Sequence, residues 1–284
     1  LVDTRPTTFD ELIRISGLSH GTDVWLGNAQ SLIEAGTVTL QDAICCRDDI
    51  MIYLIKQGLP PNPAFKIMET VRKGKALKDP EKWAEYVNLM KEHNVPDWYI
   101  KSCEKIKYMF PKAHAAAYVT NAFRIAWFKV HEPLAYYAAY FSIRADEFDS
   151  EYMIFGKEKV KNKMKEIDLQ GNAATVKDKN MYAILELVLE MYERGFEFLP
   201  IDLYKSSSTK FLVEDGGIRP PLNSIPGLGT VAAQGIEKAR KDGKFMSIDD
   251  LKIRSKVGVS VTDLLKKFGC LEGMSQSNQM SLFG

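Results

Sequence analysis

The chain has 284 residues, and 45% of them are hydrophobic, which is enough apolar content for a buried core and for two domains. Its 38 basic and 37 acidic residues leave a formal net charge of +1, which excludes a bulk polycation, so any nucleic-acid surface must come from local clustering. The four cysteines form no Cys-x-x-Cys pair, and no apolar run approaches the ~20 residues of a membrane span. We therefore expect a cytoplasmic protein with no membrane segment and no metal site of its own.

The first 60 residues predict short helices separated by loops. Thr39 has the position of a helix cap before Leu40. Asp48 and Asp49 are adjacent acids, but neighbours on a helix point about 100° apart and do not converge on one ion. We therefore expect these two carboxylates to be surface charges.

A short basic cluster follows the proline-rich break at residues 60–63. The helix predicted over residues 64–71 ends in Arg72, Lys73 and Lys75. Basic side chains at the carboxyl end of a helix are ordinary partners of the helix dipole. By themselves they indicate no ligand.

The most informative stretch is Phe110-Pro-Lys-Ala-His-Ala-Ala-Ala-Tyr118, which comes after helices predicted over residues 81–93 and 96–109. Pro111 suits the first position of a helix, and the alanine run is strongly helix-forming. His114 and Tyr118 fall on one face, and Lys112 lies in the first turn, where free N–H groups and the helix dipole favour an anion. The stretch suits a nucleotide, with the triphosphate at the helix start and the base beside Tyr118, although an ordinary packing helix would have the same pattern.

Beyond Pro133 the pattern predicts a further helix, then helices over residues 150–167 and 178–194. Short apolar runs over residues 196–203 and 211–213 and at Ile218 suit strands or extended connections. The lysine-rich segment 157–165 is equally consistent with a solvated helix face and with a nucleic-acid surface.

Residues 222–240 have the apolar-Pro-Gly-apolar-Gly pattern of a helix-hairpin-helix, in which glycines let the turn offer backbone N–H groups to a DNA phosphate. Residues 247–268 are similar to a second, poorer copy. The residues that we expect to contact DNA are Gly227, Leu228, Gly229, Thr230, Lys238, Arg254, Lys256 and Gly258.

The polar tail of residues 274–284 is expected to be disordered and ends in Gln279-Met-Ser-Leu-Phe283. A glutamine and an apolar pair on a flexible arm suit insertion into a hydrophobic pocket of a partner, with Leu282 and Phe283 as anchors.

Together these motifs resemble the bacterial family C replicative DNA polymerases, most closely the PolC type of the DNA polymerase III alpha subunit. The alanine-rich stretch and Phe128-Lys-Val-His-Glu-Pro-Leu-Ala-Tyr-Tyr137 resemble the fingers helix, residues 218–273 the duplex-binding region, and the end of the tail the peptide that binds the sliding clamp. The terminal position of that peptide favours the PolC type, and the abrupt start at Leu1 suggests a carboxyl-terminal fragment.

The resemblance implies a mainly α fold with three parts. Residues 1–195 would form a fingers domain, residues 196–273 a small α(+β) tandem helix-hairpin-helix domain, and residues 274–284 a tail with the clamp-binding residues Gln279, Met280, Leu282 and Phe283.

The resemblance also implies the partners and their sites: dNTP, primer–template DNA and the beta sliding clamp. The implied contacts to the dNTP are Phe110, Lys112, His114, Tyr118, Arg72, Lys73 and Lys75. Mg²⁺ would be bound by palm carboxylates that this chain lacks, because no Asp-x-Asp lies on an apolar strand here, so the chain alone is expected to be inactive. A non-enzymatic DNA-binding and clamp-recruitment module is the alternative. A repair enzyme with helix-hairpin-helix motifs is disfavoured, because this chain has no catalytic Lys or Asp positioned just after the hairpin.

Overall fold

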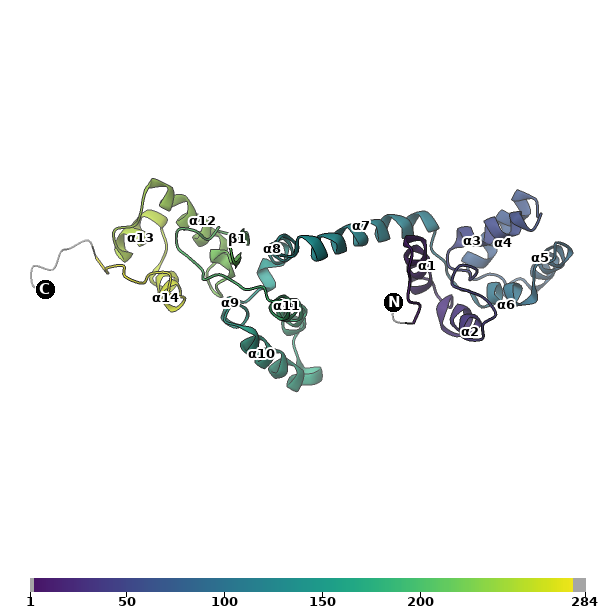
Figure 1. Ribbon diagram of the computed structural model, residues 1–284, viewed down its shortest axis with the longest axis horizontal. Helices are drawn as coiled ribbons and strands as arrows, with labels where there is room; N and C mark the ends of the chain where they lie inside the picture. Colours follow the sequence, from purple (N-terminus) through teal and green to yellow (C-terminus); the bar gives the residue numbers. More distant parts are fainter. Residues whose placement is uncertain (1–2, 278–284) are drawn as a thin grey trace, which may run out of the picture. The chain divides into compact units, whose positions relative to one another are not determined.

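The computed structural model describes residues 3–277, and their contacts divide the chain into two units, Leu1–Arg124 and Ile125–Gly284 (Figure 1). The fold is mainly α-helical, as predicted, with one small two-stranded sheet among these residues. The division falls within helix α7 (Lys112–His131). The domain boundary predicted at residues 195/196 lies inside the second unit and stays a prediction.

The first unit packs its helices around one apolar core that includes Ile50, Ile67 and Tyr99. Helices α3 and α4 lie side by side in it (Figure 1). Its helices before α7 are α1 (Phe9–His20), α2 (Gln30–Glu34), α3 (Arg47–Lys56), α4 (Pro61–Arg72), α5 (Pro80–Glu92) and α6 (Asp97–Lys105).

Two predicted bounds in this unit are wrong. No helix begins at Leu40, because Thr39 and Asp42 close a turn instead, with the Thr39 hydroxyl donating to the Asp42 carboxylate at 2.6 Å. The helix predicted to run to residue 109 ends at Lys105, because Tyr108 leaves it to form an antiparallel bridge with Thr22.

The second unit contains two apolar cores. One lies among α8 (Pro133–Ile143), α9 (Ser150–Met153), α10 (Lys157–Gln170) and α11 (Val176–Glu193), with α10 and α11 side by side (Figure 1). The other lies among α12 (Thr230–Ala239), α13 (Ile248–Ser255) and α14 (Val259–Lys267).

The strands β1 (Leu212–Glu214) and β2 (Gly217–Arg219) pair antiparallel, with Val213 opposite Ile218. This pairing confirms the extended runs predicted there, whereas residues 196–203 contribute only a single bridge from Phe198 to Ile218. No helix in the described part of the chain is both long and apolar enough to cross a membrane.

Candidate nucleic-acid interface

The amino end of α7 already holds two carboxylates of the chain itself. The backbone N–H of Lys112 donates to the Asp48 carboxylate at 2.6 Å, and the Lys112 ammonium pairs with Asp10 at 3.1 Å. Hydrogen bonds from Arg14 and then from Lys112 lower the pKa of Asp10. Acidic groups therefore occupy the place in which the sequence predicted a phosphate.

The prediction that Asp48 and Asp49 are mere surface charges is wrong. Asp48 accepts the α7 hydrogen bond, and Asp49 accepts the backbone N–H groups of Cys45 and Cys46 at 3.2 and 2.8 Å, which caps the start of α3. Both carboxylates fix local backbone, so neither is free for an ion.

A row of aromatic rings runs along the surface at the start of α7. His114 lies between Phe110 and Tyr118, with ring centroids 5.2 and 4.6 Å away. His114 is exposed, and 65% of Tyr118 is exposed. The face predicted from helical periodicity is thus accessible to a ligand that can stack.

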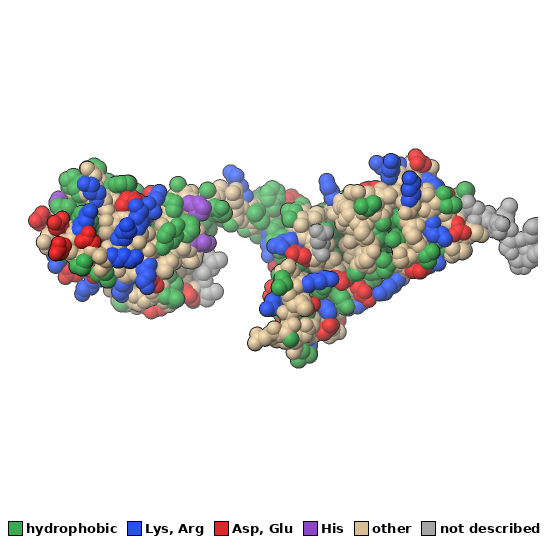
Figure 2. Space-filling view, turned by 180° about the vertical axis from the view of Figure 1, so that it is seen from behind, with side chains coloured by type: hydrophobic (Ala, Val, Ile, Leu, Met, Phe, Trp, Pro, Cys, Tyr) green, Lys and Arg blue, Asp and Glu red, His purple; other side chains and the backbone are tan. Residues whose placement is uncertain are grey.

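Two further rings extend this row beyond what the sequence predicted. His20 and Tyr108 lie 5.8 and 5.3 Å from Phe110. The backbone bridge between Thr22 and Tyr108 brings the end of α1 to this place, a long-range pairing that no local pattern signals. On the face of the first unit seen in Figure 2, Lys and Arg side chains gather near histidines, with hydrophobic side chains between them.

The basic cluster lies next to the same segment. The N–H of Met109 donates to the carbonyl of Arg72 at 3.3 Å. Gly74 has a φ of +62°, and a Cβ there would lie 2.5 Å from the carbonyl oxygen of Lys107, so only glycine permits this approach. The structure thus brings together the two predicted nucleotide-contact segments, although Arg72 and Phe110 are 38 positions apart in the sequence.

Within the cluster, Glu69 holds two of the cations. Arg72 and Lys73 both pair with its carboxylate, the Lys73 ammonium at 2.7 Å, and their hydrogen bonds lower the pKa of Glu69 to about 2. Lys75 is exposed and forms no ion pair with the residues that the structure describes.

In the second unit, the two predicted hairpins have matching geometry. The first turn places Gly227 at φ +87°, buries Leu228 and ends at Gly229, which caps α12. The second turn repeats these features with Lys256 at φ +58°, buried Val257 and the cap Gly258 of α14. Residues 254–259 are therefore a true second copy of residues 225–230.

Each hairpin presents the amino end of a helix. The first intrahelical bonds run from Ala233 to Gly229 and from Thr262 to Gly258, so the N–H groups of the preceding turn lack helical partners. Gly229, Thr230 and Gly258 are exposed there. Such an arrangement can accept a phosphate without reading base sequence.

The basic side chains behind the hairpins differ in availability. Lys238 and Lys256 are exposed. Arg254, by contrast, donates to the carbonyls of Ala239 and Gly243 at 2.5 and 3.1 Å and lies over the Phe245 ring, so its guanidinium ties α13 to the end of α12 and to the connection between the hairpins. We therefore leave Arg254 out of the DNA-contact set.

Among residues 3–277, no three His, Cys, Asp or Glu side chains come together as a metal site. The predicted clamp-binding residues Gln279, Met280, Leu282 and Phe283 lie outside the described residues.

Comparison with known proteins gives two family matches and many close relatives. Residues 1–94 match the bacterial DNA polymerase III alpha subunit finger domain, and residues 195–281 match a helix-hairpin-helix motif. The chain is 58% identical over 283 residues to the DNA polymerase III PolC-type of Oceanobacillus iheyensis and 58% identical over 283 residues to that of Bacillus subtilis. It is 56% identical over 284 residues to that of Clostridium perfringens.

These alignments cover 100% of the chain but only 20%, 19% and 19% of the respective relatives, so the chain spans about a fifth of their length. The resemblance predicted from the sequence is confirmed. The chain belongs to the PolC-type DNA polymerase III family and corresponds to a segment of it that contains a finger domain and a helix-hairpin-helix motif.

Proposed function

We propose that this chain is the nucleotide-binding and duplex-binding part of a replicative DNA-directed DNA polymerase that acts in the cytoplasm. The observation that carries the proposal is the exposed row of rings from Phe110 to Tyr118 beside the basic residues Arg72–Lys75. A dNTP needs both features, because its base stacks on rings and its triphosphate requires cations.

In this proposal the incoming triphosphate replaces the carboxylates of the chain. It replaces Asp10 as the ion-pair partner of Lys112, and it replaces Glu69 as the partner of Arg72 and Lys73. Phe110 or Tyr118 then packs on the nascent base pair. Cations that are positioned in advance by exchangeable carboxylates keep their geometry before the substrate arrives.

The duplex behind the active site is assigned to the two hairpins. Gly227–Thr230 and Lys256–Gly258 would each hold a phosphate at a helix start, with Lys238 nearby. Paired hairpins of this kind suit the two strands of a duplex, since they contact the backbone and not the bases.

Phosphoryl transfer by a polymerase uses carboxylates that hold Mg²⁺, and the described residues of this chain do not fit such a site. We assign Mg²⁺ to carboxylates of a palm domain outside this chain. Primer extension with the isolated chain, Mg²⁺ and dNTPs should therefore give no product, and template-dependent synthesis would overturn this assignment.

The test of the two binding roles compares substitutions in the intact polymerase. His114→Ala or Lys112→Ala should raise the KM for dNTP or lower kcat while the affinity for duplex DNA stays unchanged. Gly227→Val should weaken duplex binding instead. The proposal is wrong if both kinds of variant impair the same property, either the use of dNTP or the binding of duplex DNA.

We also propose that Gln279, Met280, Leu282 and Phe283 bind the beta sliding clamp. Deletion of residues 279–284 should abolish binding to purified clamp and leave the affinity for duplex DNA unchanged. Clamp binding that survives the deletion would rule this peptide out.

One observation favours a second candidate, a non-enzymatic DNA-binding and recruitment module: Lys112, Arg72 and Lys73 are all paired with carboxylates. In that case only the hairpins and the tail would act. A dNTP titration of the intact polymerase with primer–template separates the two candidates, because only the first predicts a loss of dNTP affinity in His114→Ala.

A further inference from the structure

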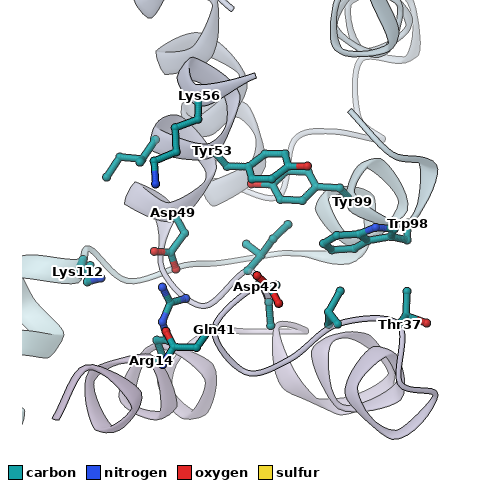
Figure 3. A pocket seen from close by; sticks show the side chains of 14 residues that line it. Arg14, Thr37, Gln41, Asp42, Asp49, Tyr53, Lys56, Trp98, Tyr99 and Lys112 are labelled. Atoms are coloured by element: carbon teal, nitrogen blue, oxygen red, sulfur yellow. The ribbon is translucent and has the colours of Figure 1, made fainter. Parts of the chain in front are cut away.

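A cavity of about 600 Å³ lies within the first unit, and of the residues assigned to the proposed dNTP site only Lys112 lines it. Figure 3 shows the stacked rings of Tyr53 and Tyr99 on one wall and Arg14, Gln41 and Asp42 on the opposite wall. Its volume is in the range of pockets that bind small molecules. The wall elements are α1, the turn at residues 37–44, α3, α6 and the first residue of α7.

Aromatic rings dominate one side of this cavity. Tyr53 and Tyr99 are stacked with centroids 4.1 Å apart at 15°, and the half-buried Trp98 meets Tyr99 edge to face at 5.4 Å. These rings offer a flat ligand a surface on which to pack.

The hydroxyl of Tyr99 has no partner. Tyr99 lines the cavity but is only 1% exposed, and its buried hydroxyl oxygen makes no hydrogen bond with the residues described. Buried hydroxyl groups in folded proteins are nearly always hydrogen-bonded. A ligand in the cavity would supply the missing partner.

The charges around the cavity leave one cation available. Asp49 and Asp42 accept hydrogen bonds from the backbone and from Thr39, respectively. The Arg14 Nε and the Lys112 ammonium both bind Asp10. Among the cations that line the cavity, only Lys56 lacks a carboxylate within ion-pair distance in the described part of the chain.

We propose that this cavity is a second ligand site, which binds a planar aromatic molecule of nucleotide size that carries an anionic group. The ring packs beside Trp98 and Tyr53, a polar ring atom bonds the Tyr99 hydroxyl, and the anion lies on Lys56. The rings of His114 and Tyr118 do not line this cavity, whereas Lys112 lines it and is also one of the proposed dNTP contacts.

The test measures the binding of dAMP to the full 284-residue chain by calorimetry, in the absence of DNA. Deoxyadenosine, which lacks the anion, should bind about tenfold more weakly, as a lost charge-assisted bond predicts. Deoxyribose 5-phosphate, which lacks the ring, should show no saturable binding.

Variants locate the bound probe. Lys56→Gln and Tyr99→Phe should each weaken dAMP binding about tenfold, whereas the control Lys91→Gln, an exposed lysine on α5, should leave it unchanged. The proposal is overturned if dAMP does not bind, or if its affinity is the same in Lys56→Gln and Tyr99→Phe as in the unmodified chain. Loss in His114→Ala alone would place the probe on α7 and would also overturn it.

Discussion

At the scale of single residues, carboxylates hold the cations that the proposed function assigns to phosphate. Glu69 binds Arg72 and Lys73, and Asp10 binds Lys112. The carboxylates would compete with a triphosphate for the same donors, so the affinity of the site depends on how readily these pairs open.

We predict that Glu69→Gln in the intact polymerase lowers the KM for dNTP several-fold. The amide keeps the side-chain volume but no longer competes for Arg72 and Lys73. Steady-state kinetics at low salt measures the effect, and Glu158→Gln, whose carboxylate is 78% exposed near Lys161, is the matched control. A raised KM would show that the positioning of these cations by Glu69 outweighs its competition with the triphosphate.

The second residue-scale prediction concerns Tyr99. Without ligand, Tyr99→Phe removes a buried hydroxyl that has no partner, so the free energy of unfolding should rise by about 1 kcal/mol. Urea unfolding of the chain measures this change. A decrease of similar size would mean that the hydroxyl has a bonding partner in the folded chain.

At the scale of elements, the two hairpins show that one backbone shape is built from different residues. Gly227 and Lys256 occupy the same left-handed position, at φ +87° and +58°. A lysine there is strained, but it places a cation at the tip of the second turn. Because the second copy lacks this glycine, its sequence matches the hairpin pattern less well than the first copy does.

We predict that Gly227→Ala destabilises the chain by about 1–2 kcal/mol, because an L-residue is unfavourable at positive φ. Gly229→Ala is the control: its φ is −67°, and a Cβ there meets no atom within 4 Å. Thermal unfolding should separate the two variants. Duplex binding should weaken in Gly229→Ala as well, since the new methyl group blocks the approach of a phosphate, and unchanged binding would contradict the hairpin contact.

At the scale of the whole molecule, the near-zero net charge conceals many paired carboxylates. Their partners lower the pKa of Asp10 and Glu69 in the first unit and of Glu193 and Glu214 in the second. Burial raises the pKa of Asp149 and so acts in the opposite direction.

From these pKa shifts we predict that the chain becomes less stable as the pH falls. A carboxylate whose folded pKa is lowered contributes fully above its unfolded value of 4.5, and this contribution is lost as pH falls through the folded value, about 2 for Glu69. The free energy of unfolding should therefore fall between about pH 4.5 and pH 2, as chemical denaturation at several pH values will measure. Stability that is constant over this range would show that the pairs do not persist in solution.

Much of this molecule follows from local sequence rules. Pro111 and the alanine run determine where α7 begins, and periodicity determines that His114 and Tyr118 share a face. The glycine pattern of residues 225–229 determines the hairpin turn. Each of these properties depends on residues only a few positions apart, so the sequence alone was sufficient.

What only the tertiary structure decided depends on residues far apart in the chain. Three contacts join separate segments. They are the ion pair of Lys112 with Asp10, the bridge that brings His20 to Phe110, and the close approach of Gly74 to Lys107. The same holds for Arg254, a predicted DNA contact whose guanidinium donates to the carbonyls of Ala239 at the end of α12 and of Gly243 in the connection after it. Side-chain charge and helix periodicity are local properties, whereas the partner that a charge finds depends on packing across the whole unit.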